Sequence, residues 1–246
     1  MEDSLIECLV LRLDSPLMSF GGVCVDHVNP TDRFPGRSLI TGLIGNALGL
    51  DRSDFAILSH LQKSLHFACR WDAEPASLVD YQTVDLGHDF MQGTGWTTRG
   101  RREDRGTGSA TKETHQRYRH YWANGCATVI VNLGPESSFT HEQVERALKH
   151  PARPLFFGRK ACVPAAPLFV RRRFVRNLLE ALCTEPLAEI GPRARPVNIE
   201  ACWPLGTSLP TESQIGIWER YDIKNWHDGL HTGSEQCHHG FIEVVS

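Results

Sequence analysis

Residues 38–49 read SLITGLIGNALG and carry the strongest helical pattern in the chain. Their apolar side chains recur three and four residues apart, which places them on one face of an α-helix. Ser38 is the candidate N-cap, and Gly49 is the expected C-terminal stop. Gly42 and Gly45 each cost about 1 kcal/mol relative to alanine inside a helix, so we expect this helix to pack closely against a neighbouring element.

The segments around this helix alternate between strand and helix patterns. The expected elements are a strand at 5–13, a helix at 53–63, strands at 64–71 and 126–133, and a helix at 141–149 that Thr140 caps. This order predicts an α+β protein with a ferredoxin-like core, the fold of RNA-recognition modules. We expect that domain to span 1–170, with a smaller, strand-rich C-terminal region at 171–246.

The composition is that of an ordinary globular protein. The chain has 246 residues, of which 41% are hydrophobic and 22% are charged. No apolar run reaches the roughly 18–20 residues that span a bilayer, and the acidic first residues are unlike a signal peptide, so we expect a cytoplasmic protein with no membrane partner. The eight cysteines contain no CxxC pair, so we expect them to be small buried hydrophobic residues.

Positive charge is concentrated in two segments although the net charge is −3. Residues 99–120 contain seven arginine and lysine residues against three acidic ones, and residues 159–176 contain six with no acidic residue. Segregated basic segments are typical of polyanion binding. The alternative is that both segments are solvated surface runs. The first overlaps a polar, glycine-rich stretch at 86–111, and long loops of that kind are usually functional or disordered.

Four sequence blocks carry a resemblance to a known family. They are LRLDSPLMSFG at 11–21, PTDRFPGRS at 30–38 with the glycine-bearing helix after it, DYQTV at 80–84 with KET at 112–114 and YRHY at 118–121, and PLFFGRKACVP at 154–164. Together they resemble the CasD family, which grips the 5′ handle of the guide RNA in the CRISPR surveillance complex Cascade. The blocks keep the family's order and cover about two thirds of the chain.

The resemblance implies a non-catalytic subunit of a type I-E Cascade. Such a subunit binds the 5′ handle of crRNA, caps the foot of the complex and supports crRNA-guided DNA targeting in antiviral defence. A β-hairpin thumb is then expected at about 86–118, directed toward the first backbone subunit. The implied partners are crRNA, CasC-type backbone subunits, a CasA-type large subunit and, through the complex, target DNA. No cofactor, metal or catalytic residue is implied.

The candidate RNA-binding residues combine cations and aromatic rings, because phosphates bind to arginine and lysine while unstacked bases stack on planar groups. They are Arg33, Arg37, Ser38, Tyr81, Trp96, Arg99, Arg101, Arg102, Arg105, Lys112, Arg119, Arg159 and Lys160. Arg37 and Ser38 stand at a helix N-terminus, where unpaired N–H groups attract phosphate. The alternative is that Ser38 only caps the helix.

Two rival interpretations stay open. A metal-independent endoribonuclease that processes crRNA precursors needs a general base and a cation, and the candidates are Lys112, His115, His120 and Tyr121. The second rival interpretation is a free-standing RNA-recognition module outside CRISPR. Near the C-terminus, His227, His231, Cys237, His238 and His239 are potential zinc ligands, but their spacing matches no standard site, so we expect a surface tail there.

Overall fold

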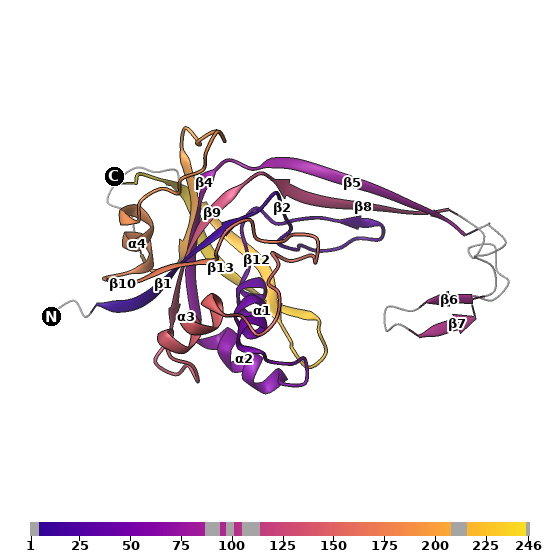
Figure 1. Cartoon of the computed structure of the whole chain (residues 1–246), viewed down its shortest axis with the longest axis horizontal. Helices are drawn as coiled ribbons and strands as arrows, with labels where there is room; N and C mark the ends of the chain where they lie inside the picture. Colours follow the sequence, from indigo (N-terminus) through magenta and orange to yellow (C-terminus); the bar gives the residue numbers. More distant parts are fainter. Residues whose placement is uncertain (1–4, 87–93, 97–100, 105–113, 208–215, 245–246) are drawn as a thin grey trace.

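A seven-stranded antiparallel sheet forms the centre of the protein (Figure 1). The computed structural model describes residues 5–86, 94–96, 101–104, 114–207 and 216–244. Within these residues four helices pack against the sheet, and a long two-stranded ribbon leaves one end of it. The α+β class expected from the sequence is confirmed.

The order of the central strands is β10-β1-β9-β4-β11-β13-β12. Their bounds are β1 (Ile6–Asp14), β4 (Leu65–Ala73), β9 (Cys126–Leu133), β10 (Phe169–Val175), β11 (Ile199–Pro204), β12 (Gly216–Lys224) and β13 (His231–Ile242). The strands predicted at 5–13, 64–71 and 126–133 are confirmed by β1, β4 and β9. The strands after residue 170 extend the same sheet, so the boundary expected there falls inside β10.

Helices cover both faces of this sheet, and the burial of β1 explains why. The helices are α1 (Arg37–Leu48), α2 (Phe55–Ser64), α3 (His141–Lys149) and α4 (Leu178–Thr184). Leu9, Leu11 and Leu13 pack with α1 and α3, whereas Cys8 and Val10 pack with α4. Side chains alternate between faces along a strand, so a strand with two apolar faces must be covered on both.

The ends of the helices match the sequence in part. Gly49 follows α1 in the left-handed region at φ 83°, as expected for a C-terminal stop. Thr140 forms a capping box with Gln143 at the start of α3, which confirms its predicted role. Ser38 as the N-cap of α1 is wrong, because the helix begins at Arg37 after Gly36.

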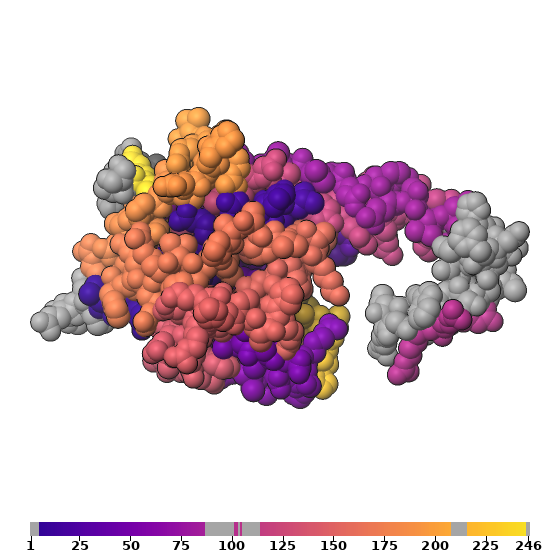
Figure 2. All heavy atoms as spheres, viewed as in Figure 1, coloured from indigo at the N-terminus to yellow at the C-terminus, as the bar shows by residue number. Residues whose placement is uncertain are grey.

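A second, four-stranded sheet carries the ribbon. Its strands are β2 (Leu17–Met18), β3 (Val28–Asn29), β5 (Ala76–Asp85) and β8 (Thr114–Ala123); β6 (Thr94–Trp96) and β7 (Arg102–Asp104) form a separate pair between β5 and β8 in the chain. β5 and β8 pair along their whole length, from Ala76 opposite Ala123 to Asp85 opposite Thr114. Figure 2 shows this β5–β8 ribbon standing clear of the body.

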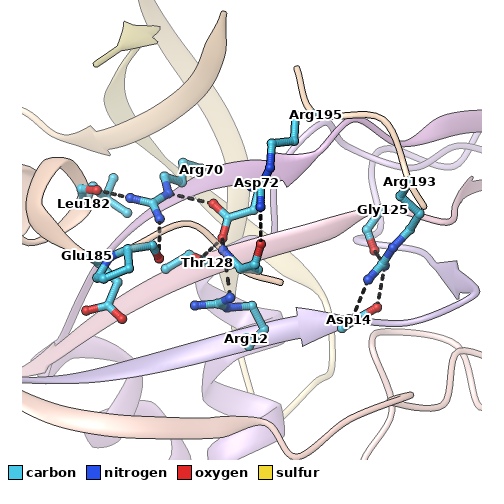
Figure 3. A network of polar contacts seen from close by, with 12 residues as sticks. Arg12, Asp14, Arg70, Asp72, Gly125, Thr128, Leu182, Glu185, Arg193 and Arg195 are labelled. Carbon is cyan, nitrogen blue, oxygen red and sulfur yellow. Dashed lines mark hydrogen bonds and ion pairs between the residues drawn. The ribbon is translucent and has the colours of Figure 1, made fainter. Parts of the chain in front are cut away.

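A buried polar network fastens the segment after α4 to the sheet (Figure 3). Arg70 on β4 donates to Asp72 at 2.7 Å and to the carbonyl oxygens of Leu182 and Pro186. Asp72 also accepts from the Thr128 hydroxyl at 2.7 Å. Arg70 and Asp72 are fully buried, so the loss of one partner would leave an uncompensated charge and would cost roughly 3–5 kcal/mol. This network has a structural role.

Six of the eight cysteines are buried, as the sequence predicted for the group: Cys8, Cys69, Cys126, Cys162, Cys202 and Cys237. Burial raises the pKa of the Cys8 thiol to about 11 and that of Cys126 to about 12, which keeps both thiols protonated at neutral pH. The helices in the described part of the chain are each too short or too polar to cross a bilayer.

Candidate nucleic-acid interface

A cleft of about 830 Å³ runs along α1. One wall is α1, with Gly42 and Gly45, and the other walls are loop 19–30, loop 153–160 and the region from Asp222 to His231 at the ends of β12 and β13. A Cβ at Gly45 would lie 2.7 Å from the Leu58 side chain of α2, so this glycine allows α1 and α2 to pack closely. The sequence predicted that the helix with these glycines packs closely against a neighbour, and Gly45 shows this packing against α2.

Three cations in this cleft are free of acidic partners. Arg52, Lys160 and Lys224 line it, and none of them forms an ion pair within the described residues. Lys224 lies 4.6 Å from the centre of the Trp226 ring, and burial together with the nearby charge of Arg52 lowers the pKa of Lys224. A cleft that gathers cations without matching carboxylates attracts a polyanion.

Both acidic residues of the cleft are engaged by the chain itself. Asp51 pairs with Arg153 at 3.0 Å, and Arg153 also donates to the Leu50 carbonyl at the end of α1. Asp222 accepts from the Ser38 backbone N–H at 2.8 Å and from the Ser38 hydroxyl. The carboxylate of Asp222 thus occupies the position at the helix N-terminus that the sequence offered to a phosphate.

Arg33 and Arg37 make internal contacts. The Arg33 guanidinium pairs with Glu74 at 2.6 Å and with Glu200, and lies 5.4 Å from the Trp71 ring. Arg37 donates to Glu235 at 2.7 Å and to the carbonyl oxygens of Gln62 and Leu65. Guanidiniums with such partners hold elements of the fold together.

Arg159 and Lys160 are neighbours with different surroundings. Arg159 donates to the carbonyl oxygens of His120 at 2.8 Å and Asn29 at 3.0 Å, so it joins β8 to β3 at the base of the ribbon. The preceding Gly158 has φ 92°, and a Cβ there would lie 1.7 Å from the Ser19 carbonyl oxygen. Lys160 is exposed and lines the cleft.

The candidate residues on the ribbon are only partly described. Tyr81 is 51% exposed on β5 and stacks against Tyr118 on β8 with ring centres 4.9 Å apart. Arg119 lies opposite Asp80 in the β5–β8 register. Arg101 and Arg102 are exposed. The side chain of Trp96 and the whole of Arg99, Arg105 and Lys112 lie outside the described residues.

The rival site residues lie apart where the structure describes them. His115 and His120 are five positions apart on β8, so they face opposite sides of the ribbon. Tyr121 is buried beneath the Arg159 guanidinium at 4.6 Å. Lys112 lies outside the described residues.

The C-terminal histidines are not a surface tail, because His238 and His239 lie in β13. His239 contacts Glu200 at 2.7 Å, and His227 contacts Asp228 at 2.6 Å. Over the described ranges, no three histidine, cysteine or acidic residues converge as a metal site would require.

Sequence reasoning missed Arg52, Lys224 and Trp226. Arg52 lies in the turn before α2, just after the second recognisable block, whereas Lys224 ends β12 and Trp226 lies in the turn after it, far from every block. The only local signal is Trp226 close to Lys224 in an otherwise polar turn, since a partly exposed tryptophan beside a cation is typical of RNA contacts.

Comparison with known proteins decides the family. Residues 8–243 match the model of the family described as "CRISPR-associated protein (Cas_Cas5)". The chain belongs to this family. This Cas5-family protein is 33% identical over 164 residues to "CRISPR system Cascade subunit CasD" of Escherichia coli (strain K12), across 66% of this chain and 69% of the relative. The predicted resemblance is confirmed, and the protein is a CasD-type subunit.

Solved structures support the same relationship. A chain from a structure titled "CRISPR RNA-guided surveillance complex" superposes with a TM-score of 0.69 at 27% identity, covering 96% of this chain and 90% of that one. A second structure, "Crystal structure of Cas protein", gives a TM-score of 0.59 at 22% identity over 96% of this chain and 95% of that chain, and so shows the shared fold alone.

Proposed function

We propose that this Cas5-family protein is a non-catalytic subunit of a type I-E Cascade that binds the 5′ handle of crRNA in the cleft along α1. The observation that carries the proposal is a cleft of about 830 Å³ lined by Arg52, Lys160 and Lys224, three cations that form no ion pair with any residue the structure describes. The likeness to a Cascade subunit over most of that subunit's length supports the assignment to the complex. Its site of action is then the cytoplasm.

The residues that line the cleft make two kinds of contact with RNA. Arg52, Lys160 and Lys224 neutralise phosphates, which fixes the path of the strand and carries little base information. The half-buried Trp226 is held by a hydrogen bond from its Nε1 to Gln62 at 3.1 Å, and it offers an aromatic edge for a base at the same end of the cleft. Target DNA is read by pairing with the guide, so this subunit needs no contact with target bases.

The order of strands and helices along the chain supports a ferredoxin-like core. The run β1, α1, β4, β9, α3 and β10 has the β-α-β-β-α-β order of a ferredoxin-like unit, and the sheet order β10-β1-β9-β4 fits it. The β5–β8 ribbon is the thumb, directed at a CasC-type backbone subunit. Val79 and Tyr81, two positions apart on β5, expose apolar surface on one face of the ribbon, and neighbouring exposed apolar side chains mark interaction surfaces.

A CasA-type large subunit is the other expected neighbour at the foot of the complex. Endoribonuclease activity is the alternative function, and its described candidates His115 and His120 lie on opposite sides of the ribbon. Incubation of the purified protein with repeat RNA separates the two functions: binding without new fragments supports the proposal, and specific fragments that disappear in a His115→Ala or His120→Ala variant support the enzyme.

The direct test removes two cleft cations. Arg52→Ala/Lys160→Ala is compared with Lys63→Ala/Arg146→Ala, which removes two exposed cations on α2 and α3 outside the cleft. Each lost contact to phosphate is worth roughly 1.5–3 kcal/mol, so handle affinity should fall at least about tenfold in the first variant only. The slope of log affinity against log salt should fall by about 1.4, since single strands give about 0.7 per neutralised phosphate. Equal affinity and slope in both variants would remove the cleft as the binding site.

A further inference from the structure

A second cavity, of about 140 Å³, opens beside the RNA cleft. It is lined by Gly22 and Val23 of one loop, by Asp32–Phe34, and by Trp218–Tyr221 of β12, and it reaches the buried Cys202 and Cys237. Neither the family relation nor the proposed handle contacts assign a role to it. We refer to it as the β12 pocket.

Aromatic side chains form one side of the β12 pocket. Trp218 is 40% exposed and Tyr221 is 60% exposed. The Trp218 ring is fixed from behind by His239, with ring centres 3.7 Å apart and an interplanar angle of 28°. A partly exposed indole that is already held in place is a ready stacking platform for another flat ring.

One polar group in the β12 pocket is open. The Asp32 carboxylate accepts no hydrogen bond from any residue in the described part of the chain, although Asp32 is half-buried. The two cations that line the pocket are already engaged: Arg33 by Glu74 and Glu200, and Arg220 by Glu235. A bound ligand that donates a hydrogen bond to the half-buried Asp32 carboxylate would therefore be favoured.

The β12 pocket and the RNA cleft share their border. Gly21 lines the cleft and Gly22 lines the pocket, while Asp222 lines the cleft and Tyr221 the pocket. Both glycines have positive φ, 89° and 133°, so one side of the border is backbone without side chains, and Tyr221 and Asp222 form the other side. A nucleotide whose phosphate lies in the cleft can therefore turn its base across this border.

We propose that the β12 pocket takes one unstacked nucleobase of the RNA held in the cleft, and that Asp32 makes it favour a base with an exocyclic amino group. Adenine, cytosine and guanine each present an N–H donor of this kind to a carboxylate. Uracil presents a single N–H between two carbonyl oxygens, which repel a carboxylate. The inference rests on the proposed function, because it requires RNA in the neighbouring cleft, and it adds base selectivity to that function.

A basic side chain of a partner protein is the competing occupant, since aromatic rings and a carboxylate also suit a cation. The observations favour the base, because the shared border with the cleft brings RNA to the entrance of the β12 pocket.

The test measures the affinity of the full-length protein for short single-stranded RNAs made only of adenylate, cytidylate or uridylate, at fixed salt. The variants are Asp32→Asn and, as the control, Asp26→Asn, which removes the same charge from a neighbouring exposed loop position. Trp218→Leu and Tyr221→Leu remove the stacking surface, and Tyr221 is exposed enough for the fold to tolerate its loss.

The wild-type protein and Asp26→Asn should bind adenylate and cytidylate RNAs several-fold more tightly than uridylate RNA. Asp32→Asn should reduce that ratio toward one, and Tyr221→Leu and Trp218→Leu should weaken all three by a few fold. Normal RNA binding with no base preference, or a preference unchanged in Asp32→Asn, would overturn the inference and leave the proposed function standing. Failure of every RNA to bind would overturn both. Binding of an arginine-rich peptide that Asp32→Asn abolishes, with RNA binding unaffected by the same change, would assign the pocket to a protein partner.

Discussion

The arginine run of β10 and the cleft along α1 are both basic, but only one of them has free charge. On β10, Arg171 and Arg173 pair with Glu185, and Arg172 pairs with Glu7 and Glu145. In the cleft, Arg52, Lys160 and Lys224 have no acidic partner among the residues that the structure describes. The comparison teaches that a basic run in the sequence indicates a binding surface only when the fold brings no carboxylates to it.

Strand geometry explains the pairing on β10. Arg171 and Arg173 point to one face and share the buried Glu185 that follows α4, while Arg172 points to the other face, toward α3. β10 is also an edge strand, where charged side chains protect against pairing with another chain. The second basic segment of the sequence is therefore mainly structural, apart from Lys160.

The largest expected effect comes from removing Glu185, the carboxylate that pairs with Arg171 and Arg173 of β10. Glu185→Ala deletes a buried carboxylate with hydrogen bonds of 2.8 and 3.0 Å to two arginines. Unfolding free energy should fall by roughly 2 kcal/mol, because charge-assisted hydrogen bonds are lost. Glu142→Ala, which removes an exposed ion pair, should cost less than about 0.5 kcal/mol. Urea unfolding measures both, and equal stability of the two variants would show that the Glu185 contacts contribute little.

Charge reversal at one site in each region sharpens the comparison. Lys160→Glu should weaken handle binding by about tenfold without lowering the unfolding temperature, because Lys160 is exposed and unpaired. Arg172→Glu should leave handle affinity within about twofold and reduce stability, because it places a third carboxylate beside Glu7 and Glu145. Anisotropy titrations and thermal unfolding give both readouts. Weakened handle binding in Arg172→Glu with unchanged binding in Lys160→Glu would place the RNA on β10.

A substitution on the β5–β8 ribbon should have a smaller effect, on assembly of the complex. Tyr81→Ala removes an exposed ring that stacks on Tyr118, so unfolding free energy should change by less than about 0.5 kcal/mol. Incorporation into a reconstituted Cascade should fall a few fold if the ribbon contacts a neighbouring subunit. Thr83→Ala on the same strand serves as the control in a pull-down assay. Unchanged incorporation of both variants would separate the ribbon from assembly.

The smallest expected effect is a pH dependence at the start of α1. Burial is the main cause that raises the pKa of Asp222, so the folded protein holds this proton more tightly than the unfolded chain. Stability contributed by Asp222 is therefore greatest below its unfolded pKa near 4 and is lost as pH rises through its raised folded value. The difference in unfolding free energy between wild type and Asp222→Asn should fall with rising pH in this acid window and then level off. A difference that grows with pH would reverse the assigned sign.

Local patterns predicted the elements better than the site. The periodicity of 38–49 and the aliphatic run at 5–13 gave α1 and β1, because these features depend on residues close in the chain. The contact between Ser38 and Asp222 joins residues 184 positions apart, so no local pattern contained it. Arg33 and Arg37 were predicted as RNA contacts for the same reason: their carboxylate partners Glu200 and Glu235 come from the last third of the chain.

The resemblance to a family supplied what local patterns could not. It implied an inserted hairpin at about 86–118, most of which lies outside the described residues, and the described β5–β8 ribbon leaves the body between β4 and β9 just before and after that segment. It gave no guidance on the turn between β12 and β13, where Lys224 and Trp226 complete the cleft, because the recognisable blocks end near residue 169.

The most direct test of the central claim is cross-linking of handle RNA with photoreactive bases, followed by mass spectrometry of the attached peptides. The RNA is bound to the full-length protein, alone and within a reconstituted complex. Cross-links should map to the peptides that contain Lys160 and Trp226, on opposite walls of the cleft. Cross-links confined to 171–176, on the paired arginine run, would contradict the account.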